Sequence, residues 1–132
     1  MDLNREASAI AESASEEIRA LNHRSLPGHF KQPADVYAVA ESLATLIARM
    51  PQALHQLGRA VQDFQDRQAI RMDDGSDPAE RVACVAVALA DAVRGLEAAQ
   101  AAMRRANSPL AGMGGYFTAD EDGDEVGEDA GV

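Results

Sequence analysis

The stretch LATLIARMPQALHQLGRAV, residues 43–61, decides the fold, because it places a proline inside an apolar heptad pattern. An interior proline costs a helix about 3 kcal/mol and disfavours helical geometry at the preceding residue, so Pro51 could separate two helices. The apolar positions nevertheless keep alternating spacings of four and three on both sides of it: Val36, Ala40, Leu43, Ile47, Met50, Leu54, Leu57, Val61 and Phe64. No glycine stop and no Ser, Thr, Asp or Asn cap stands beside the proline. We therefore predict one helix from about Ala34 to Met72, kinked near Pro51. The alternative is a four-helix bundle whose chain breaks at Met50/Pro51.

Helical spacing also predicts a helix on each side of this long one. The first has apolar residues from Leu3 to Leu21, with Asp2 or Asn4 as its N-cap, and ends before the loop SLPGHFKQP, residues 25–33. The motif DDGSDPAE, residues 73–80, separates the second and third helices. Within it, Gly75 suits a helix C-cap, Asp77 an N-cap, Pro78 the first helical position and Glu80 the third.

The third helix is expected to reach about Ala106, where Asn107, Ser108 and Pro109 end it. Its apolar positions again follow a heptad, which favours shallow crossing angles. The fold class is therefore all-α, an elongated antiparallel three-helix bundle that spans residues 1–107. A Gly-rich flexible segment, 108–118, and a disordered acidic tail, 119–132, are expected to follow it.

Charge and composition exclude several function classes. The tail carries seven acids and no base, and the remaining residues have fifteen acids and twelve bases, so that part has a net charge of only −3. Such a balance favours no nucleic-acid partner. The longest apolar run, residues 82–90, is too short to span a bilayer, and no signal peptide is apparent. With Cys84 as the single cysteine, we expect a cytoplasmic protein without a disulfide.

His55 is the candidate for chemistry on the long helix. Histidine phosphotransfer domains are acidic helical bundles of similar size, and their histidine is followed by Leu, Lys and Gly at the second, third and fourth positions. This chain resembles them in Leu57, but Gly58 and Arg59 stand in the reverse order. The residue at i+4 lies over the face of the histidine, so the Arg59 side chain would cover the space that an aspartyl phosphate needs. We therefore expect His55 to be a solvated residue on the flank of the helix.

No metal, cofactor or catalytic site is expected. The three histidines do not pair at i, i+4, and no HExxH pattern occurs. The acids near residues 16–17 and 63–66 lie off the apolar positions and beside arginines, as on a solvated face. The acidic tail lacks the glycine and glutamate that a calcium-binding loop requires.

Tyr116 and Asp120 form a Tyr-x-x-x-Asp pattern after the last helix. The pattern resembles the export signal that follows the helices of type VII secretion substrates, which implies a secreted helical protein as an alternative. In composition the whole chain resembles short Ala- and Arg-rich helical proteins of high-GC actinobacteria, a likeness that implies no activity.

The start of the third helix is apolar on every side. With Val82 and Leu89 facing the bundle, Cys84 and Val87 fall on the opposite side and Val85 on the flank. A helix that is apolar all round is usually buried on more than one side. Either the first helix or another chain covers that side, and the first helix is expected to lie nearer the other end of the long helix. The sequence thus predicts a non-enzymatic helical protein–protein interaction module that self-associates, as a homodimer, through Cys84, Val85 and Val87.

Overall fold

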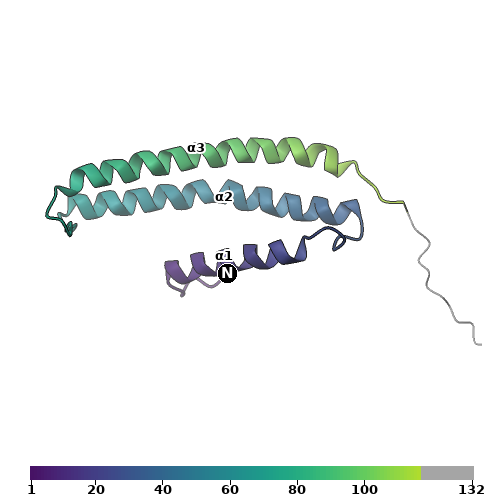
Figure 1. Cartoon of the computed structure of the whole chain (residues 1–132), viewed down its shortest axis with the longest axis horizontal. Helices are drawn as coiled ribbons and strands as arrows, with labels where there is room; N and C mark the ends of the chain where they lie inside the picture. The colour runs from purple at the N-terminus through teal and green to yellow at the C-terminus, as the bar shows by residue number, and fades with distance from the viewer. Residues whose placement is uncertain (117–132) are drawn as a thin grey trace, which may run out of the picture.

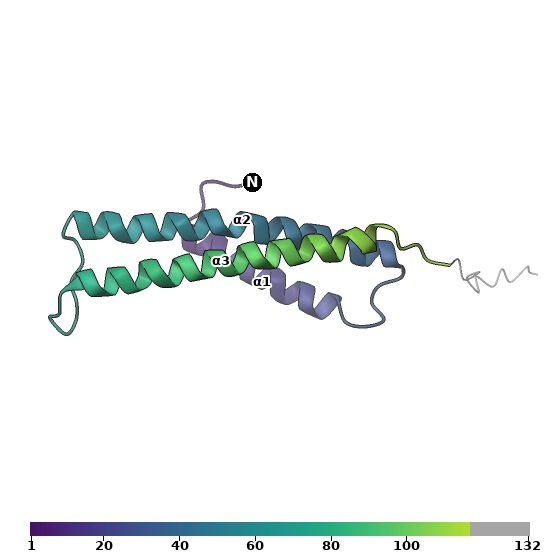
Figure 2. The ribbon, with the colours of Figure 1, turned by 90° about the horizontal axis from the view of Figure 1, so that it is seen from above.

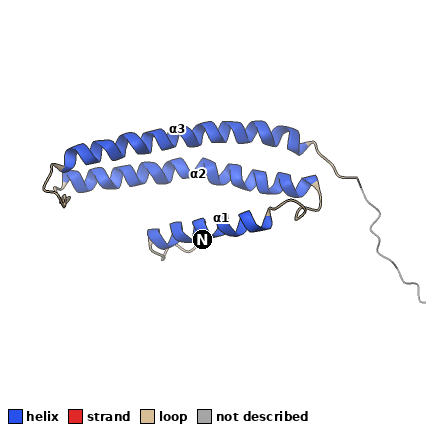
Figure 3. Ribbon diagram, viewed as in Figure 1, coloured by secondary structure: helices blue, strands red, loops and turns tan. Residues whose placement is uncertain are grey.

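The computed structural model describes residues 1–116, which form three helices and no strand. Helix α1 spans Ala7–Arg24, α2 spans Pro33–Asp66 and α3 spans Pro78–Ala111. Helices α2 and α3 form a long antiparallel hairpin, and α1 runs back along α2 to a point past the middle of α2, on the side away from α3 (Figure 1). Figure 2 shows α1 crossing the hairpin obliquely, and Figure 3 shows that only loops connect the helices. The predicted elongated three-helix architecture is confirmed; the acidic tail lies outside the described residues.

Helix α2 continues through Pro51, so the prediction of one long helix is confirmed and the four-helix alternative is wrong. Proline lacks the N–H that a helix interior uses, which costs about 3 kcal/mol. Helix α2 lies beside the same neighbour, α3, on both sides of Pro51, along the length of the hairpin (Figure 1). Packing against α3 on both sides offsets the local cost of the proline.

The beginnings of the helices follow capping chemistry. At α3 the Asp77 carboxylate accepts a hydrogen bond from the Ala79 N–H at 2.9 Å, and Pro78 occupies the first helical position, as predicted. Helix α2 begins with Pro33, where the Asp35 carboxylate accepts from the Gln32 N–H at 3.2 Å and the Asp35 N–H donates to the Gln32 backbone carbonyl at 3.0 Å. The predicted cap of α1 is wrong.

Helix α1 begins at Ala7, after Glu6, and no side chain caps it. The Asp2 carboxylate instead accepts from the Asn4 N–H at 3.0 Å, within the turn that precedes the helix. Asp2 therefore stabilises a local turn, because short polar side chains often hydrogen-bond to nearby backbone groups in turns that compete with a helix.

Helix α2 ends at Asp66, six residues before the predicted Met72. Gln68 adopts φ 53°, in the left-handed region, and the Ala69 N–H donates to the Phe64 carbonyl at 2.9 Å. Together with the Gln68 N–H, which donates to Gln65, this is the Schellman end that glycine usually makes. Gly75 was expected to cap the helix; it has φ 73° in a separate turn, where its N–H donates to Met72.

Helix α3 runs to Ala111, beyond its predicted end at Ala106. Asn107 does not terminate it, because its side chain is buried against α2 and donates a hydrogen bond to Glu41. Pro109 is accommodated within the final turn of the helix. Residues 108–111, expected in the flexible segment, are therefore helical.

The interior of the chain is small. Val82 and Val93 are the only buried apolar side chains of the described residues, each 7% exposed. Helix α1 contributes no buried residue, and none of its Cα atoms lies within 8 Å of a Cα atom of α2 or α3. The described residues thus form a hairpin with one long contact between α2 and α3, and α1 is loosely attached to it.

Candidate interaction surface

An apolar stripe on α2 receives α1. Ile18 and Leu21 of α1 face Val39, Leu43 and Leu46 of α2 across a groove of about 380 Å³. The five side chains are half-buried, which agrees with the absence of close backbone contact. A helix is therefore the element that this stripe accommodates.

The stripe continues along the second half of α2, where most of it lies beyond the end of α1 (Figure 1). Its members keep the heptad spacing of 3, 4, 3 and 4 and are Met50, Ala53, Leu57, Ala60 and Phe64, which we call the open stripe. Met50 is 40% exposed, Leu57 56% and Phe64 48%. Because residues seven apart lie on one face of a helix, the open stripe shares the face on which α1 packs.

Two residues of α3 extend this surface. Val85 and Ala92 are seven residues apart and exposed, and helical spacing places both on the flank of α3 that adjoins the open stripe. We call the open stripe together with Val85 and Ala92 the hairpin face. None of its seven side chains is polar or charged.

The structure separates the three residues predicted for self-association. Cys84 and Val87 lie together on the outer side of α3, where they line a shallow groove of about 370 Å³ with Ala83, Ala88 and Asp91. Val87 is 63% exposed and Cys84 carries a free thiol. Val85, 38% exposed, does not line that groove and belongs to the hairpin face. Exposed apolar side chains at the start of α3 therefore point in two directions.

Sequence reasoning missed the open stripe, because it assigned Met50, Leu57 and Phe64 to the contact between helices. A heptad pattern has two apolar positions, which form two rows of apolar residues along the helix. A narrow contact with one neighbouring helix buries only one of these rows. Here the row Leu54, Val61 is half-buried and the row Met50, Leu57, Phe64 is exposed. The seven-residue spacing of Met50, Leu57 and Phe64, considered as a row of its own, was the signal in the sequence that could have predicted the open stripe.

His55 lies on the opposite side of the hairpin from the open stripe. It is exposed and borders a groove of about 260 Å³ with Arg59, Gln62 and residues of α3. Arg59 shares this groove with the histidine, as its i+4 position predicts. Within residues 1–116, no three His, Cys, Asp or Glu side chains are grouped as metal ligands.

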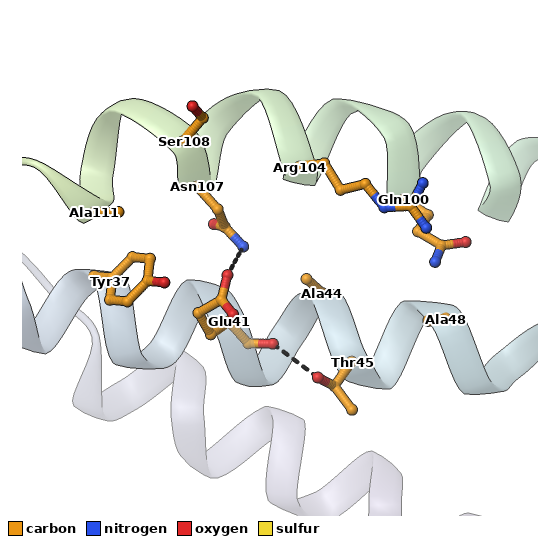
Figure 4. A pocket seen from close by; sticks show the side chains of 10 residues that line it. All are labelled: Tyr37, Glu41, Ala44, Thr45, Ala48, Gln100, Arg104, Asn107, Ser108 and Ala111. Atoms are coloured by element: carbon orange, nitrogen blue, oxygen red, sulfur yellow. Dashed lines mark hydrogen bonds between the residues drawn. The ribbon is translucent and has the colours of Figure 1, made fainter.

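A polar contact joins the helices near the other end of the hairpin (Figure 4). Asn107 is 7% exposed, and its side-chain N–H donates to the carboxylate of Glu41. Its Oδ1 is buried and accepts no hydrogen bond from the described part of the chain. Tyr37 and Arg104 line the adjacent open groove of about 410 Å³. Only Asn107 of this pair is buried, and a polar contact of this kind between two helices favours one register.

Tyr116 is fully exposed beyond α3, and Asp120, its partner in the Tyr-x-x-x-Asp pattern, lies outside the described residues. None of the helices described is long and apolar enough to cross a bilayer. The sequence matches no protein-family model, and comparisons with curated proteins and with solved structures find no significant match.

Proposed function

We propose that the protein is a non-enzymatic helical interaction module of the cytoplasm that binds a second copy of itself through the start of α3. One observation carries this proposal: the exposed apolar residues Cys84, Val85 and Val87 stand on a hairpin in which, within residues 1–116, Val82 and Val93 are the only buried apolar residues. A soluble chain rarely leaves so much apolar surface in contiguous stretches unless a partner covers it.

The accessible surface supports the same proposal. The chain exposes 11088 Å², whereas a compact monomer of 14.0 kDa exposes about 6,700 Å². An allowance of about 2,500 Å² for residues 117–132, the area of a chain of that length with nothing buried, does not remove the excess. Each partner in a standard protein–protein interface buries about 800 Å², so the excess exposed area is large enough for one such interface.

Light scattering tests this function, with circular dichroism to verify helicity. The wild type should have a mass of twice 14.0 kDa at tens of micromolar. The double variant Val85→Glu, Val87→Glu places a charge on each of the two exposed apolar sides of α3. Its mass should fall to that of one chain while helicity persists. Ala98→Glu, Ala101→Glu adds the same charge farther along α3, at two exposed positions, and should leave the mass unchanged. A wild type that is monomeric throughout rejects the proposal.

A secreted helical substrate is the second candidate, supported by the full exposure of Tyr116 just after the hairpin. An export signal must be accessible to be recognised, and this position meets that condition. Appearance of the wild-type protein in culture supernatant, with retention of a Tyr116→Ala variant inside the cells, would support this candidate against the first.

A further inference from the structure

We propose that the second copy docks on the hairpin face, so that the uncovered halves of two hairpins form an antiparallel four-helix bundle. This inference rests on the proposed self-association and assigns it a surface. The surface consists of Met50, Ala53, Leu57, Ala60 and Phe64 of α2 with Val85 and Ala92 of α3. It excludes Val87, which points away from it.

The first argument is that the docking element is helical. The open stripe repeats the spacing of the residues that already receive α1, and it lies on the same face of α2. Apolar residues at heptad spacing insert between side chains of a facing helix, as in coiled coils and antiparallel bundles. The open stripe therefore fits an apolar helix surface of the kind that the hairpin itself presents.

The second argument is the absence of charge. The cations nearest to the hairpin face along each helix are Arg49 and Arg59 of α2 and Arg81 and Arg94 of α3, none of them a member of the face; Arg81 and Arg94 are paired with Asp74 and Asp91. The acidic residues 119–132 offer seven carboxylates to a face that has no free cation among its seven members, so they do not suit it. Two copies of an uncharged face, in contrast, meet without like-charge repulsion.

The third argument is length, which also fixes the symmetry. Helix α2 measures about 51 Å, and its open part from Met50 to Asp66 about 25 Å, at roughly 1.5 Å per residue. Because α1 lies beside α2 to a point past the middle of α2 in each copy, only the parts of the two hairpins beyond α1 can meet (Figure 1). A two-fold axis that crosses the hairpins near Leu57 brings the open halves together with the two α2 helices antiparallel.

The test compares two single substitutions by light scattering. Leu57→Glu charges the centre of the hairpin face, and its mass should fall to that of one chain. Val87→Glu introduces the same charge at a more exposed apolar position on the outer side of α3, so it distinguishes the hairpin face from a contact made through Cys84 and Val87. Its mass should stay at twice 14.0 kDa. If Val87→Glu dissociates and Leu57→Glu does not, this inference is wrong while the proposed self-association stands; a monomeric wild type rejects both.

Cross-linking covers the case in which Leu57→Glu loses helicity. In a Cys84→Ala background, Leu57→Cys should give a covalent dimer with a short bis-maleimide, because the two copies of residue 57 lie near the symmetry axis. Ala98→Cys, exposed on the outer side of α3, should remain a monomer under the same conditions. A dimer with the residue 98 variant, and none with the residue 57 variant, would overturn the inference.

Discussion

Asn107 is the buried polar residue of the described chain, and it connects α3 to Glu41 of α2. Its Oδ1 is desolvated without a compensating hydrogen bond. Replacing a buried, half-satisfied polar group with an apolar one of similar size is neutral or stabilising. Asn107→Leu should therefore leave the free energy of unfolding unchanged or raise it by about 1 kcal/mol in urea titrations. Glu41→Gln, which still accepts from Asn107, is the control. A loss of about 2 kcal/mol or more for Asn107→Leu would show that the pair stabilises the hairpin.

Asp74 gives the loop between α2 and α3 a measurable pH dependence. The hydroxyl of Ser76 donates to its carboxylate at 2.6 Å and the Ser76 N–H at 3.0 Å, and these bonds lower the pKa of Asp74 below 3.8. A lowered folded pKa means that the contribution to stability is complete above 3.8 and is lost as the pH falls through the folded pKa. Carboxyl titration by NMR should show this lowered value. Ser76→Ala should move it upward, and an unchanged Asp74 pKa in that variant would contradict the assignment.

At the scale of secondary-structure elements, the end of α2 depends on one unfavourable backbone conformation. Gln68 adopts φ 53°, which costs a residue with a side chain roughly 1–2 kcal/mol and glycine almost nothing. Gln68→Gly should raise the free energy of unfolding by about 0.5–1 kcal/mol, after the greater chain entropy of glycine is subtracted. Gln65→Gly, inside the helix, should lower it by a similar amount. Destabilisation by Gln68→Gly would mean that the helix end does not persist in solution.

Helix α1 should open more readily than the hairpin. It has no buried residue and no close backbone approach to α2, so its hydrogen bonds are supported by little packing. Hydrogen exchange should be faster for amides in the middle of α1 than for those between Leu89 and Leu96 of α3, which surround the buried Val93. Equal protection in the two regions would show that α1 is docked more firmly than the geometry indicates.

The sequence was sufficient for the elements that depend on periodicity and on strong caps. Continuity through Pro51 followed from an unbroken apolar pattern, and the start of α3 followed from Asp77 and Pro78. The end of α2 was not predictable in this way, because Gln68 occupies a left-handed position at which glycine usually marks the end of a helix. The end of α3 was missed because Asn107, a residue typical of helix ends, is used in a tertiary contact.

The interaction surface was only partly predictable, for a reason of geometry. Periodicity shows which residues are apolar along a helix, but the neighbours decide which of those residues are covered. Helix α1 has 18 residues and α2 has 34, so about half of one face of α2 has no helix beside it. Leu57 and Phe64 resembled core residues for that reason, whereas Val87 was expected on the side of the third helix away from the bundle, where it is 63% exposed.

At the scale of the whole molecule, the central claim is that two copies complete one apolar core. The most direct measurement is the mass of the wild-type protein by light scattering over a range of concentrations. The account predicts twice 14.0 kDa at tens of micromolar, a decrease toward 14.0 kDa on dilution, and a single-chain mass for Leu57→Glu at all concentrations. A wild-type mass of 14.0 kDa at every concentration, with helicity intact, would contradict it.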